Sequence, residues 1–178
     1  MSGNSGDRDS NRFEFRANAP VPIGRQAEPR VLGVVNRLLS AGNRVLELPA
    51  RDEYGEDARF SVNGEPYTVQ VTGVPQAPAF WSRVVSEGSG TTTATLQEMS
   101  GWLETAIETK VRTIPSSERQ NTIIVLDAHS WADRVVDPQV ISALSSSGLN
   151  PAQRLRLGGI AIVGAGTSNS TWIPGLLP

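Results

Sequence analysis

The sequence predicts a three-layer α/β domain with a mixed central β-sheet. Residues 30–41 and 95–114 carry apolar side chains at the spacing of amphipathic helices. Residues 122–126 and 159–163 are apolar throughout, which is typical of strands covered on both faces. A β-hairpin within residues 57–72 adds antiparallel strands. Helices that alternate with buried strands favour this architecture.

The hairpin is the clearest local element. Residues 58–62 alternate between inward and outward positions, and Asn63 with Gly64 is the strongest two-residue turn signal. Residues 67–72 follow as a β-branched and aromatic run. The sequence therefore predicts two antiparallel strands joined by a tight turn.

One face of the second hairpin strand is expected to be polar. Because side chains alternate along a strand, Thr68, Gln70 and Thr72 share a face and point toward whatever Asp57 faces. A carboxylate at the head of a hairpin, with polar residues at its far end, is the layout of a metal-dependent nuclease site. The solvent-facing side of an edge hairpin has the same pattern, so both interpretations stay open.

The remaining elements complete the order α-β-β-β-α-α-β-α-β. The first helix ends at the pair Gly42 and Asn43, and Pro115 ends the long one. The other predicted elements are a strand at residues 44–48, a short helix at 78–86, a helix at 137–146 and a last edge strand after residue 166.

This order resembles the core of the PD-(D/E)xK, or restriction-endonuclease-like, superfamily: a helix, a three-stranded antiparallel meander, a helix and a further strand. The resemblance covers roughly residues 25–130. In that family two acids and a backbone carbonyl bind magnesium, and the lysine of the (D/E)xK triplet assists the attacking water. The resemblance implies Mg²⁺-dependent (or Mn²⁺-dependent) hydrolysis of phosphodiester bonds in DNA or RNA.

The family pattern is carried over residue by residue. Asp57 matches the first acid, Gln70 the second, Val71 the carbonyl donor and Thr72 the lysine. Glu47 matches an additional acid found in some members. The resemblance therefore implies that Asp57, Gln70 and Val71 are ligands of the ion.

Two of these positions depart from the family pattern. The amide of Gln70 can still coordinate a hard cation, although a neutral ligand lowers the affinity. Thr72 cannot supply the positive charge of a lysine. Lys110, the only lysine among 16 basic residues, or an arginine would have to replace it. The alternative is a catalytically degenerate nuclease-fold subunit, which binds a protein or a nucleic acid as a structural or regulatory module.

The sole histidine is a second candidate for catalysis. His129 follows Asp127 at the end of a buried strand, where α/β proteins place functional groups. It is a candidate general base. In the simpler interpretation, Asp127 only caps the helix that follows.

Composition predicts one domain over residues 21–178. A chain of 178 residues with 38% hydrophobic content can form one core, and no apolar run approaches the length of a membrane span. We therefore expect a cytoplasmic protein that does not bind membranes. The net charge of −2 is not the basic excess of a sequence-independent DNA-binding protein.

Residues 1–20 are expected to be a disordered leader or a docking arm. The first 11 residues contain no hydrophobic segment, whereas Phe13 and Phe15 could dock on the domain or on a partner protein. Because the leader lacks apolar periodicity, deletion of residues 1–18 is expected to leave the stability of the core unchanged.

Overall fold

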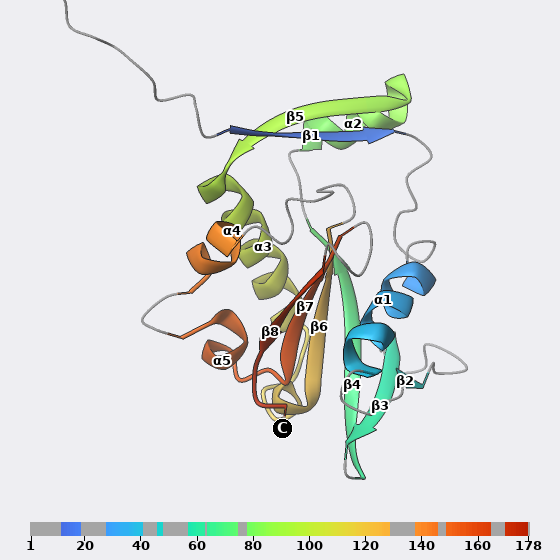
Figure 1. Cartoon of the computed structure of the whole chain (residues 1–178), viewed down its shortest axis with the longest axis vertical. Helices are drawn as coiled ribbons and strands as arrows, with labels where there is room; N and C mark the ends of the chain where they lie inside the picture. The colour runs from blue at the N-terminus through green and yellow to red at the C-terminus, as the bar shows by residue number, and fades with distance from the viewer. Residues whose placement is uncertain are drawn as a thin grey trace, which may run out of the picture.

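The computed structural model contains a mixed six-stranded sheet with helices on both faces (Figure 1). It describes residues 12–18, 28–40, 46–47, 57–62, 64–74, 78–128, 138–145, 149–164 and 170–177. The strand order is β2-β3-β4-β6-β7-β8. The bounds are β2 Leu46–Glu47, β3 Ala58–Val62, β4 Glu65–Gly73, β6 Thr122–Asp127, β7 Gly159–Val163 and β8 Ser170–Pro174.

The direction of the strands changes twice across the sheet. β2, β3 and β4 pair antiparallel, β4, β6 and β7 pair parallel, and β8 returns antiparallel to β7. A parallel pair needs a crossover, and helix α3 (Leu96–Val111) lies in the connection between β4 and β6. The predicted α/β class with a mixed sheet is confirmed.

Each face of the sheet has its own apolar layer. Helix α1 (Glu28–Ser40) packs on one face, where Ile123 and Val125 of β6 meet its apolar side. Ile124 and Leu126, which alternate with them, belong to the core beneath α3. This alternation explains why residues 123–126 of β6 are all apolar. Helices α4 (Pro138–Ala143) and α5 (Pro151–Arg154) lie on the same side as α3 (Figure 1).

A second, two-stranded sheet was not predicted. β1 (Arg12–Asn18) pairs antiparallel with β5 (Ser89–Thr95), and α2 (Pro78–Glu87) lies against this ribbon. Figure 1 shows the ribbon crossing beyond the carboxyl ends of the parallel strands. The end of the predicted leader is thus a strand docked on the domain, which is one of the two alternatives that the sequence allowed.

The ends of most predicted elements shift by a few residues, as is usual for helix and strand boundaries. The long helix begins after an N-cap at Thr95, whose hydroxyl accepts from the Glu98 backbone while the Glu98 carboxylate accepts from the Thr95 backbone. It ends at Val111, three residues before the predicted end. The guanidinium of Arg119 donates to the carbonyls of Val111 and Ile114 and so satisfies the end of the helix.

Candidate functional site

The hairpin of β3 and β4 has one apolar and one polar face. The register pairs Ala58 with Val69 and Phe60 with Tyr67, and these four side chains are buried beneath α1. The rings of Phe60 and Tyr67 stack with centroids 5.2 Å apart. Arg59 and Thr68 lie between these two pairs along the strands, and their side chains face the opposite side of the sheet.

The predicted polar face exists. Arg59 pairs with Thr68 in the register, Arg59 is exposed, and Thr68, Gln70 and Thr72 are half-buried. The apolar cluster that includes α3 takes Ile124 and Leu126 from β6 and Ile160 and Ile162 from β7, but no residue of β4. The polar residues of β4 therefore lie beside the core without belonging to it.

Asp57 is bonded to the backbone on both sides of Gln70. Its N–H donates to the carbonyl of Val69 at 3.0 Å, and its Oδ2 accepts from the N–H of Val71 at 2.5 Å. Asp57 and Ala58 thus both lie against Val69, the two-to-one arrangement of a β-bulge. The structure thus places Asp57 at the edge of β4, against the backbone of the residues on either side of Gln70.

The backbone of Val71 faces the same site. In an extended strand the N–H and the C=O of one residue point to the same side, so the Val71 carbonyl points to the edge from which Asp57 approaches. The carboxylate of Asp57, the amide of Gln70 and the carbonyl of Val71 are oxygen donors of the type that Mg²⁺ prefers. The donor set fits a hard divalent cation, with one formal negative charge to hold it.

The other predicted residues lie on three different elements. Glu47 is the register partner of Arg59 on the neighbouring strand β2. Thr72 pairs with Leu126 near the carboxyl end of β4. Lys110 occupies the last turn of α3 and is half-buried.

The structure separates Lys110 from Thr72. Arg119 donates a hydrogen bond to the carbonyl of Val111 at the end of α3. Arg119 lies just before Thr122 in the chain, and Thr122 is the register partner of Thr68. Lys110 therefore lies toward the Thr68 end of β4, while Thr72 lies at its opposite end. The two are not brought together.

Asp127 has a structural role on the other face of the sheet. Its Oδ1 accepts from the Arg30 guanidinium of α1 at 2.6 Å, and the same guanidinium donates to the carbonyl of Gly164 at 3.1 Å. His129 lies outside the described residues, so its role as a general base stays a prediction. The structure assigns Asp127 to an ion pair.

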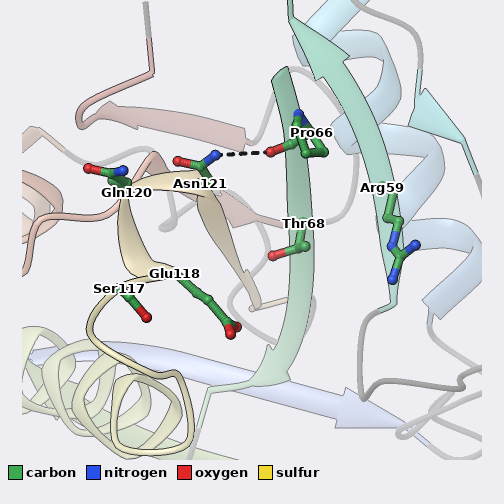
Figure 2. Close-up of a pocket in the computed structure, with 7 residues that line it drawn as sticks. All are labelled: Arg59, Pro66, Thr68, Ser117, Glu118, Gln120 and Asn121. Atoms are coloured by element: carbon green, nitrogen blue, oxygen red, sulfur yellow. Dashed lines mark hydrogen bonds between the residues drawn. The ribbon is translucent and has the colours of Figure 1, made fainter. Parts of the chain in front are cut away.

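A pocket that the sequence did not predict lies at the Thr68 end of the polar face (Figure 2). Its volume is about 600 Å³. The polar pattern of the hairpin indicated Arg59 and Thr68, but no pattern connected them to the loop before β6. The lining residues are Arg59, Pro66, Thr68, Ser117, Glu118, Gln120 and Asn121.

The residues that the structure describes include neither a cluster of metal ligands nor a membrane-spanning helix. They contain no group of three or more His, Cys, Asp or Glu residues that could hold a metal ion. Among the same residues, no helix combines the length and the apolar character that crossing a bilayer requires.

No protein-family model matches this chain, and neither a curated protein nor a solved structure shows significant similarity to it. Its function is therefore inferred from the geometry of its own residues.

Proposed function

We propose that this chain is a divergent restriction-endonuclease-like protein that hydrolyses phosphodiester bonds in DNA or RNA with the help of Mg²⁺ or Mn²⁺. The observation that carries this proposal is the position of Asp57, bonded to the backbone of Val69 and Val71 on either side of Gln70. The order of the elements supports it, since an antiparallel meander is followed by a helix and a parallel strand.

The residues of the site have distinct roles in this proposal. Asp57 supplies the only formal charge, and Gln70 and Val71 add neutral oxygen donors. Val71 N–H orients the carboxylate of Asp57 by its hydrogen bond. A bound divalent cation supplies the positive charge that activates water and stabilises the developing phosphate charge. Thr72 can donate a hydrogen bond at this end of the strand but carries no charge.

The first experiment is calorimetric titration of Mn²⁺ and Mg²⁺ into the wild-type chain and into Asp57→Asn. The variant keeps an oxygen that can accept from Val71 and removes the charge. We expect the wild type to bind one ion, and Asp57→Asn to bind at least about tenfold more weakly because the remaining donors are neutral.

The matched control is Glu65→Gln. It removes the same charge from the opposite end of the hairpin, where Glu65 is exposed. Its ion affinity should equal that of the wild type. Equal binding by wild type and Asp57→Asn would show that any bound ion lies elsewhere, and absence of binding to the wild type would contradict the proposed site.

The second candidate function is the degenerate nuclease fold, which binds a nucleic acid or a protein without cleaving it. One observation favours it: Thr72 occupies the position of the triplet lysine, and Lys110 lies toward the other end of β4. Cleavage assays with Mn²⁺ on single-stranded DNA, duplex DNA and RNA separate the two functions. Ion binding without cleavage of any of these substrates would favour the binding module.

A further inference from the structure

The pocket at the Thr68 end of the hairpin has an ordered wall. Glu118 N–H donates to the carbonyl of Pro115 at 2.9 Å, and the Glu118 carbonyl accepts from the N–H of Asn121 at 3.0 Å. The side-chain nitrogen of Asn121 donates to the carbonyl of Pro66 on β4 at 3.1 Å (Figure 2). The loop that carries Glu118 is thereby held against the hairpin.

The hydroxyl of Thr68 is left as a hydrogen-bond acceptor. Thr122 Oγ1 donates its only proton to the carbonyl of Glu118 at 2.9 Å. The contact of 3.1 Å between the hydroxyls of Thr68 and Thr122 must then use the proton of Thr68. The free lone pairs of Thr68 Oγ1 therefore remain available to a ligand.

The pocket presents a carboxylate on the loop and a guanidinium on β3. Figure 2 shows the Glu118 side chain extending from the loop toward β4, the strand that carries Thr68, and both side chains can accept hydrogen bonds. Arg59 lies on the adjacent strand β3 and supplies a guanidinium, which donates and is positive. The pocket thus suits a ligand with N–H donors at one end and an anionic group at the other.

We propose that this pocket binds a guanine nucleotide, with the base at Glu118 and Thr68 and the phosphate at Arg59. Guanine presents two neighbouring N–H donors, which a carboxylate can accept together. The planar guanidinium of an arginine can donate two hydrogen bonds to the oxygens of one phosphate group. The volume of about 600 Å³ is in the range of small-molecule sites. In a nucleic acid this nucleotide would flank the bond near Asp57, and that part of the inference rests on the proposed function.

The test is titration of guanosine monophosphate into the wild-type chain in the presence of a chelator, followed by inosine monophosphate. Inosine monophosphate lacks only the exocyclic amine and should bind roughly tenfold more weakly. Glu118→Gln should weaken guanosine monophosphate roughly tenfold or more, because the variant loses one of the two acceptor oxygens and the charge. Since Glu118 is exposed, the variant should keep its circular dichroism and melting curve.

The matched control is Glu87→Gln, which removes an exposed carboxylate at the end of α2 and should leave the affinity unchanged. The chelator separates this test from the ion site, because nucleotide binding without divalent cations does not depend on Asp57. Equal affinity for the two nucleotides, an unaltered affinity in Glu118→Gln, or no binding by the wild type would each overturn the assignment.

Discussion

At the scale of single residues, Asp57 has a structural role besides the ion-binding role that we propose for it. Its carboxylate satisfies the N–H of Val71, and its own N–H is satisfied by the carbonyl of Val69. A carboxylate in this position closes the end of the hairpin even without an ion. Stability and ion binding are therefore both measured on the same variants of Asp57.

Asp57→Ala should lower the free energy of unfolding by about 1–3 kcal/mol, because the N–H of Val71 loses a charged acceptor. Asp57→Asn should cost less, since an amide oxygen can replace the carboxylate. Urea unfolding followed by circular dichroism measures both. A loss in Asp57→Ala no larger than that of Glu65→Gln would show that the bond to Val71 adds nothing to stability.

At the scale of elements, the β1–β5 ribbon depends on the contact with α2. The buried positions of β5 are Gly90 and Ala94, and a Cβ at Gly90 would lie 2.7 Å from Cγ2 of Val84 and 3.1 Å from the carbonyl of Phe80. Only glycine permits this close approach of strand and helix. An isolated two-stranded ribbon is marginal in water, so each strand needs both its partner and the helix behind it.

Deletion of residues 1–18 should lower the melting temperature by several degrees, because it removes β1 and leaves the edge of β5 without a partner. This outcome differs from the prediction made from the sequence alone. Deletion of residues 1–11 is the matched control, since it keeps Arg12–Asn18 complete, and it should leave the melting temperature nearly unchanged. Identical melting of the two truncated chains would show that β1 contributes nothing to stability.

At the scale of the whole molecule, one ion pair connects two layers. Arg30 of α1 contacts Asp127 at the end of β6 and the carbonyl of Gly164 after β7. The side chains of Arg30 and Asp127 are only 27% and 13% exposed, so water screens their attraction weakly. The pair fixes the start of α1 over the carboxyl ends of the parallel strands.

Arg30→Met should lower the free energy of unfolding by about 1–3 kcal/mol, because it leaves the carboxylate of Asp127 partly buried without this cation. Arg112→Met is the comparison: its pair with Glu108 has a separation of 3.8 Å and an arginine that is 79% exposed, and the change should stay within about 0.5 kcal/mol. Denaturant unfolding measures both. Equal losses in the two variants would mean that the layers do not depend on Arg30.

The sequence by itself determined the elements whose signal is local. The 3.6-residue period of α1 and α3, the apolar run of β6 and the turn at Gly64 depend on neighbours in the chain, and all of them appear in the structure. The alternation along β4 also predicted its polar face with Gln70. These features follow from backbone geometry and from the need to bury apolar side chains.

Only the tertiary structure decided how distant segments meet. The pairing of β1 with β5 joins strands more than 70 residues apart. Phe13 and Phe15 alternate with charged residues, as in a strand, but this local pattern does not indicate which strand is the partner. The ion pair of Arg30 with Asp127 and the pocket between Thr68 and Glu118 likewise depend on the parallel pairing of the central strands. Such contacts arise from the packing of layers, which a local pattern does not encode, and this is why the position of Lys110 could not be read from its helix.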